Sequence, residues 1–489
     1  MDADEFRTRG RQMVDYVADY LDTIDSRRPL PDVTPGYLRE LIPSTAPDRG
    51  ENFDTVMADL DRVIMPGVTH WHSPQFHAYF PAANSFPALL GDILSGGLGA
   101  IGFTWASNPA CTELEVAMMD WLGKMLQLPN DFLYSESEKG GGIIQSSSSE
   151  SALMALLCAR TEVIRQQQDN NQHLTKGQVL DKLVAYTSIE SHSCIERAAM
   201  TGLVTIRALP SDENGALRGA TLEKAVQDDL DKELIPFYLG ASIGTTTRCT
   251  FDNLKELGPV CNKHKIWMHI DAAYAGSACI CPEFRYILDG VEHAKSLAFN
   301  PHKWMQVNHD CTAMWVKDKE LIEGAFHIDY YILRQSNHGV RMPDFRHWQI
   351  PFGRRFRSLK LWFVLRSFGV SGLQALIRKD ISLAKQFERF VQSDPRFEIV
   401  AEVVLGLVCF RLKGDNSRNE RLNYLIHKDG RIHMTPSKVK DMYFLRFAIC
   451  STRTGAADVA FAWDIVREMA DKVTLENGSV CYNEFIDHD

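Results

Sequence analysis

The sequence of 489 residues has no basic block, no CxxC pair and no apolar run near the roughly 20 residues needed to cross a membrane. Lys and Arg number 53 against 63 Asp and Glu, so the net charge is −10 and the footprint of a nucleic-acid-binding protein is missing. The eleven cysteines lack zinc-ligand spacing, which indicates reduced thiols and no metal site. The start, MDADEFRTRG, has no charged-then-apolar leader, so we expect a cytoplasmic protein that binds small molecules rather than membranes or nucleic acid.

The pattern of apolar residues predicts three parts. Residues 13–24 place apolar side chains at helical spacing ahead of a proline-rich connector, which indicates a helical arm over 1–84. The apolar stripe of this arm must be buried on its own body or on a second subunit. From 85 to 358, β-rich runs such as LVAYTS, IPFYLGAS and SLAFN alternate with helical patterns, which predicts an α/β domain around a largely parallel sheet. Residues 359–489 begin with a long helix and favour a small α+β domain.

Polar residues follow several predicted strands, at the edge where ligands bind to open α/β sheets. The strand in IWMHIDAAY ends at Asp271, and SLAFNPHK delivers Lys303 32 residues later, an interval that suits one crossover between neighbouring strands. The run Ser146 to Ser149 opens a predicted helix, whose N-terminus favours a phosphate. His192 and the threonines at 245–247 follow two further strands.

Taken singly, each of these residues has an ordinary structural explanation, since serines cap helices and most lysines are solvated. Together, a reachable lysine, a buried acid, an imidazole and a hydroxyl-lined helix start suit pyridoxal phosphate. The lysine would form the Schiff base, the acid would keep the pyridine nitrogen protonated, and the serines would hold the phosphate.

The motifs NPHKW, HIDAAYAG, SSSSES, ESHSCIERA and RHWQIPFGRRFRSLKLWFVLRSFGV resemble those of the aromatic L-amino-acid decarboxylases, over nearly the whole chain. The resemblance implies a fold type I homodimer with a swapped N-terminal arm, a seven-stranded, mainly parallel sheet and a small C-terminal domain. It also implies decarboxylation of an aromatic amino acid, as in catecholamine biosynthesis.

The resemblance further assigns roles to residues. It gives Lys303 to the covalent attachment of the cofactor, Asp271 to the pyridinium and His192 to stacking on the ring. The other cofactor contacts that it implies are Ser147, Ser148, Ser149, Thr246, Asn300 and His302, with Ala273 on the opposite ring face. The substrate pocket that it implies consists of Trp71, Tyr79, Phe80, Pro81, Ala82, Gly353 and Arg446, with Ile101 and Phe103 from the partner subunit. A metal site at His70 and His72 is the alternative for the aromatic-rich segment.

Departures from the family pattern leave the substrate and the product open. Ala82 stands where catechol-using relatives usually have Thr, which leaves a preference for catechol substrates open. Gly353 disfavours histidine as the substrate, so histidine decarboxylase is only a second alternative. His192 favours the amine as product, because insect aldehyde synthases carry Asn there. A loop tyrosine that protonates the substrate carbon aligns with Ile332, or with Tyr331 after a one-residue shift. The first alternative is therefore an aldehyde-forming synthase, and a silent binding protein is the least favoured reading because Lys303 is intact.

Overall fold

A seven-stranded sheet forms the centre of one of two compact units in this computed structural model, which describes residues 1–137, 139–328 and 342–476. Its spatial order is β1-β7-β6-β5-β4-β2-β3. The strands are β1 (Gly141–Gln145), β2 (Leu183–Ser188), β3 (Thr205–Leu209), β4 (Ile235–Ser242), β5 (Trp267–Asp271), β6 (Ser296–Phe299) and β7 (Thr312–Val316). β7 is antiparallel to both of its neighbours and the other pairs are parallel, so the predicted largely parallel α/β sheet is confirmed.

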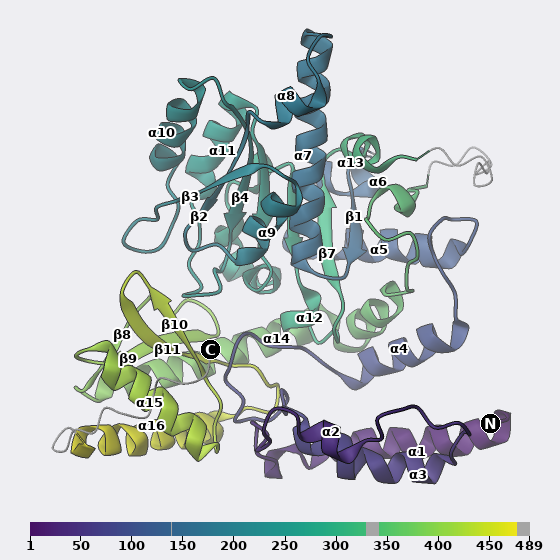
Figure 1. Ribbon diagram of the computed structural model, residues 1–489, viewed down its shortest axis with the longest axis vertical. Coiled ribbons are helices and arrows are strands. Elements are labelled where there is room, and N and C mark those ends of the chain that lie inside the picture. Colours follow the sequence, from purple (N-terminus) through teal and green to yellow (C-terminus); the bar gives the residue numbers. More distant parts are fainter. Residues whose placement is uncertain (138, 329–341, 477–489) are drawn as a thin grey trace. The chain divides into compact units, whose positions relative to one another are not determined.

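Helices cover this sheet because its central strands are buried over their whole length and need apolar layers on both faces. The longest of them within the sheet unit, α7, packs along one face against β1, β4, β5, β6 and β7 (Figure 1). The helices of this unit are α4 (Phe86–Leu98), α5 (Pro109–Leu126), α6 (Tyr134–Ser137), α7 (Ser148–Asn170), α8 (Lys176–Leu180), α9 (Ser193–Thr201), α10 (Gly219–Leu230), α11 (Leu254–His264), α12 (Pro301–Trp304) and α13 (Lys319–Phe326).

The second unit joins residues 1–81 to residues 380–489. Its antiparallel sheet has the order β10-β11-β9-β8, and the segment before residue 81 joins it where the backbone of His77 bonds with His433 and Ala448. The strands are β8 (Phe397–Ile399), β9 (Leu407–Leu412), β10 (Thr435–Val439) and β11 (Met442–Ala448). The helices are α1 (Ala3–Asp22), α2 (Tyr37–Leu41), α3 (Phe53–Asp59), α15 (Asn416–Asp429) and α16 (Ala456–Glu476).

The long helix α14 (Ser358–Ser393) begins in the first unit and ends in the second, with a non-helical residue at Gly369. The division predicted from the sequence, 1–84, 85–358 and 359–489, stays a prediction. The two units of the structure set 82–379 apart from the rest. Among the described helices, none is both long and apolar enough to cross a membrane.

Candidate active site

The lysine and the acid predicted as a pair lie on adjacent strand ends. β5 ends at Asp271 and pairs in parallel with β6, so that Asp271 lies opposite Ala298. β6 leads through Asn300 into the short helix α12, which carries Lys303 at its third position. Because two parallel neighbours end at the same sheet edge, both side chains line one cavity of about 240 Å³.

This cavity also brings together most of the other predicted cofactor residues. It is lined by Ser147, Ser148, Ser149, His192, Thr246, Ala273 and Asn300, together with Cys194, Ser242, Gly244 and Thr245. His302, which was predicted with them, is not among the lining residues, but it directly precedes Lys303 in α12.

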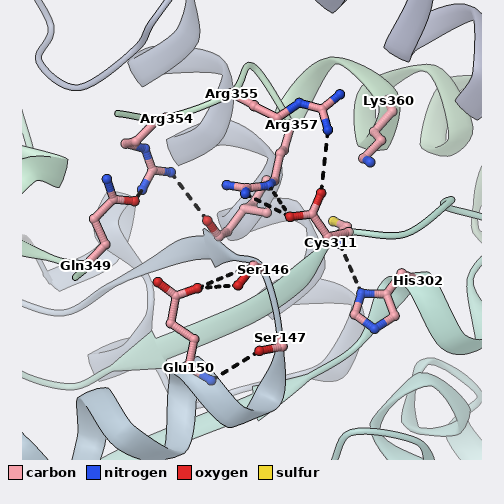
Figure 2. A network of polar contacts seen from close by, with 12 residues as sticks. Ser146, Ser147, Glu150, His302, Cys311, Gln349, Arg354, Arg355, Arg357 and Lys360 are labelled. Atoms are coloured by element: carbon pink, nitrogen blue, oxygen red, sulfur yellow. Dashed lines mark hydrogen bonds and ion pairs between the residues drawn. The ribbon is translucent and has the colours of Figure 1, made fainter. Parts of the chain in front are cut away.

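The serines of the run 146–149 make different hydrogen bonds, although the sequence does not distinguish them. Ser146 donates from its backbone and its hydroxyl to Glu150, at 3.0 and 2.6 Å, and the Ser147 hydroxyl caps α7 by accepting from the Glu150 N–H (Figure 2). Ser148 donates to Asn300 Oδ1 at 2.7 Å, which joins the helix start to the strand end beside Lys303. The Ser147 hydroxyl accepts in this arrangement and can still donate its hydrogen, so it and the N–H groups at the start of α7 form a donor set that fits a phosphate.

Asp271 is buried, and each of its oxygens has a neighbour. Oδ1 accepts the Ala273 N–H at 3.0 Å, while the Cys194 thiol lies 3.8 Å from Oδ2. Burial and the charge of Asp271 raise the pKa of Cys194, so this sulfur stays protonated and can donate. An acid held in this way at the cavity wall suits a protonated pyridine nitrogen.

His192 is held by the start of the next helix. It is the N-cap of α9, and its Nδ1 accepts the Cys194 N–H at 3.1 Å. Desolvation by the cavity walls lowers the pKa of His192, with Asp271 opposing this effect and Lys303 adding to it. The neutral ring therefore carries its proton on Nε2.

The threonines 245–247 face different partners. Thr245 bonds with Thr250 at 2.8 Å and Thr247 donates to Glu190 Oε2 at 2.7 Å, whereas Thr246 lines the cavity. Glu190 also pairs with Arg248, and both side chains are less than a tenth exposed, so the turn that presents Thr246 is anchored from behind.

The predicted substrate-pocket residues form one group in each unit. In the unit of residues 1–81 and 380–489, Trp71 stacks on Tyr79 with ring centroids 5.2 Å apart, and the Arg446 guanidinium lies 5.1 Å from the centre of the Phe80 ring. Tyr79 has a left-handed backbone, φ 57°, and its N–H donates to Thr435, which also accepts from Arg446. Pro81 directly follows Phe80 in this group.

In the unit of residues 82–379, Phe103 packs on Phe352 at 4.8 Å, and a Cβ added at Gly353 would lie 3.8 Å from Ile101. Ala82 precedes Ala83, whose N–H donates to the His302 carbonyl at 2.7 Å. Whether Ile101 and Phe103 serve a partner subunit stays a prediction.

Two predictions have other outcomes. Tyr331 and Ile332 lie outside the described residues. His70, suggested as an alternative metal ligand, bonds with the Tyr20 hydroxyl at 2.9 Å, and no group of three potential metal ligands occurs in the described part of the chain.

Cys194 is the main residue that the sequence reasoning missed. It stands two positions after His192 in ESHSCIERA. Its backbone N–H donates to His192 Nδ1, and its thiol lies 3.8 Å from Asp271 Oδ2. Cys194 and Ser149 also line a neighbouring cavity of about 400 Å³. Its nearness to a residue predicted to be functional was the signal in the sequence that could have found it.

Known proteins resemble this chain over most of its length. Residues 35–413 match the model of the pyridoxal-dependent decarboxylase conserved domain. The chain is 56% identical over 474 residues to aromatic-L-amino-acid decarboxylase of Rattus norvegicus, and this alignment covers 97% of this chain and 99% of that protein. Tryptophan decarboxylase of Catharanthus roseus, solved with L-tryptophan, is 41% identical with a TM-score of 0.91 and covers 97% of this chain and 99% of its own. A 4-hydroxyphenylacetaldehyde synthase of Rhodiola rosea is 37% identical with a TM-score of 0.90, over 96% and 99%.

Proposed function

The chain belongs to the pyridoxal-dependent decarboxylases, in the group of the aromatic-L-amino-acid decarboxylases, and we propose that it releases the amine and CO2 from its substrate. Its cofactor is pyridoxal phosphate and its substrate class is the aromatic L-amino acids. The observation that carries the proposal is the single cavity in which Lys303, Asp271, His192 and the start of α7 meet.

When bound, pyridoxal phosphate supplies a conjugated ring that accepts the electron pair left by departing CO2. Lys303 is the residue that would hold it covalently, while Asp271 would keep a proton on its ring nitrogen. The hydroxyls and N–H groups at the start of α7 would hold its phosphate. His192 would cover one face of the ring and present its Nε2 proton there.

The product depends on whether a positioned acid protonates the substrate carbon before oxygen reacts with it. His192, with its proton directed to Nε2, supports the amine. The aldehyde-forming synthase is the second candidate, and the likeness to the Rhodiola rosea aldehyde synthase favours it.

A product assay tests both candidates. Purified protein is incubated with dopa, tyrosine, 5-hydroxytryptophan, tryptophan, phenylalanine and histidine, and CO2, amine, aldehyde and peroxide are quantified. We expect CO2 and amine in equal amounts from at least one aromatic substrate. Aldehyde with equimolar peroxide would replace the amine proposal with the synthase, and faster turnover of histidine than of any aromatic amino acid would overturn the substrate class.

Exchanging the loop tyrosine sharpens this test. Tyr331→Phe removes the hydroxyl that the shifted alignment assigns to protonation, so we expect the share of aldehyde and peroxide to rise. Ile332→Val in the same loop is the matched control and should leave the product ratio unchanged. If both variants keep the amine ratio of the unmodified enzyme, Tyr331 is not the acid.

We also propose a cytoplasmic homodimer. α1 has no buried residue, although it is amphipathic, and α4 exposes an apolar stripe at helical spacing. The exposed residues of α4 are Phe86, Leu90, Ile93, Leu94 and Leu98, each more than 40% accessible. A second copy is the occupant that would cover both surfaces. Light scattering should give a mass in solution of twice the mass of one chain. The variant Ile93→Asp should lower the measured mass to that of a single chain.

A further inference from the structure

Residues 305–311, called here the return segment, connect the lysine helix α12 to β7. Several of its contacts come from residues far from it in the sequence. Ser85 donates to the Gln306 carbonyl at 2.7 Å, and Asn308 donates to Asp92 on α4 at 2.6 Å. Asp310 is held by arginines from the RRFRSLK motif, which lies just before and within the start of α14 and has had no role in the site so far.

The pair of Asp310 and Arg357 is the stronger of these arginine contacts. Arg357 donates from Nε and Nη2 to Oδ2 of Asp310, at 3.0 and 2.8 Å, and both side chains are 16% exposed (Figure 2). Burial alone would raise the pKa of Asp310, but the hydrogen bond and charge of Arg357 hold it below its usual value. Arg355 Nη1 lies 3.9 Å from Oδ1 of the same carboxylate on a side chain that is 58% exposed, so this second contact contributes little.

The residue after Asp310 determines how His302 is oriented. The Cys311 N–H donates to His302 Nδ1 at 2.9 Å, while the His302 N–H donates to the Cys311 carbonyl at 3.3 Å (Figure 2). Because Nδ1 accepts, the neutral ring carries its proton on Nε2. Burial lowers the pKa of His302 to about 3, with His309 and Lys303 acting the same way, so the ring stays neutral at ordinary pH.

We infer that Arg357 is a positioning residue for the reaction: its ion pair with Asp310 sets the return segment, and the Cys311 N–H then fixes the ring of His302 beside Lys303. The inference rests on the proposed function, because His302 and Lys303 belong to the proposed cofactor site. A shift of about 1 Å in such a group can cost on the order of a hundredfold in rate, so the effect is measurable.

The test compares Arg357→Gln, Arg357→Lys and Asp310→Asn with Arg355→Gln as the matched control from the same motif. Arg357→Gln and Asp310→Asn should each lower kcat about tenfold or more and speed the release of pyridoxal phosphate from the holoenzyme, followed by its absorbance. Arg357→Lys keeps the charge and should recover part of both losses. Arg355→Gln should stay within about twofold of the unmodified protein.

A double-mutant cycle with His302→Gln separates positioning from a general structural role. If Arg357 acts through His302, then Arg357→Gln should cost far less in kcat and in cofactor release once His302 is replaced. Additive losses in the cycle, or equal damage from Arg355→Gln, would overturn the inference. An unmodified protein that turns over no aromatic amino acid would refute the proposed function instead, and the cofactor-release cycle would still decide the role of Arg357.

Discussion

Replacing Glu115 with Gln should destabilise the sheet unit more than any exposed ion-pair change. Glu115 on α5 pairs with Arg354, and both side chains are 1% exposed. The same carboxylate oxygen accepts the Ile144 N–H of β1 at 2.7 Å, two residues before the serine run begins. Arg354 also donates to Gln349 at 2.7 Å (Figure 2). Its guanidinium lies over the Phe345 ring. Glu115→Gln keeps an acceptor for Ile144 but leaves the arginine charge buried without its carboxylate.

Breaking a buried pair by removing one partner costs about 3–5 kcal/mol. The unit of residues 82–379 has about 300 residues, so its unfolding entropy is about 0.6 kcal/mol/K and the loss corresponds to a fall in Tm of roughly 5–8 °C. Circular dichroism of the cofactor-free protein at fixed concentration measures this shift.

The matched control is Glu283→Gln, whose partner Arg378 is nearly half exposed, and it should move Tm by less than about 2 °C. A double variant, Glu115→Gln with Arg354→Met, removes the stranded charge and should recover more than half of the loss. A single variant that shifts Tm by less than about 2 °C, or a double variant as unstable as the single one, would refute the reasoning.

Three further predictions concern Lys303, the Cys194 thiol and two buried histidines. Borohydride reduction followed by peptide mapping should find the pyridoxyl group on Lys303, and a label on another lysine would contradict the assignment. Cys194→Ala removes the donor to Asp271 and should weaken cofactor affinity by roughly threefold to tenfold, whereas Cys194→Ser keeps a donor and should not. If the Ala variant binds the cofactor as tightly as the unmodified protein, the thiol has no such role. Burial lowers the pKa of His77 to about 3 and of His269 to about 4, so the unfolded chain takes up protons below about pH 6.5 that the folded chain does not. Stability should therefore fall by about 1.4 kcal/mol per residue and pH unit between pH 6 and 4, and His77→Gln should flatten that slope in urea titrations.

Strand ends were the part of the site that could be predicted from the sequence. Asp271 and Lys303 follow apolar runs one crossover apart, and local pattern with the rule for parallel sheets suffices to bring them together. The same reasoning could not assign the four serines. Their roles depend on Asn300, which lies 152 residues from Ser148 and accepts its hydroxyl, and on Glu150, which accepts the hydroxyl of Ser146.

Long-range polar partners explain most of what the sequence did not reveal. Glu115 lies 239 residues from Arg354, and Cys194 lies 77 residues from Asp271, so no periodicity connects them. The boundary between the two units of the structure is likewise not visible in local sequence patterns. α14 reads as one continuous amphipathic helix, and the sequence alone does not show that it begins in one unit and ends in the other.

A lysine just past a strand end becomes a candidate for covalent chemistry only through its surroundings. α12 has four residues, too few to be stable alone, so Lys303 depends on what holds each end of that helix. Before it, Asn300 accepts from the hydroxyls of Ser148 and Thr312, at 2.7 and 2.9 Å. After it, Asp310 is fixed by Arg357 at 2.8 Å. Lys303, the proposed cofactor lysine, is thus held by the start of α7, by the start of β7 and by Arg357 just before α14. Variants as far from Lys303 in the sequence as Ser148 and Arg357 should therefore alter how firmly the cofactor is held.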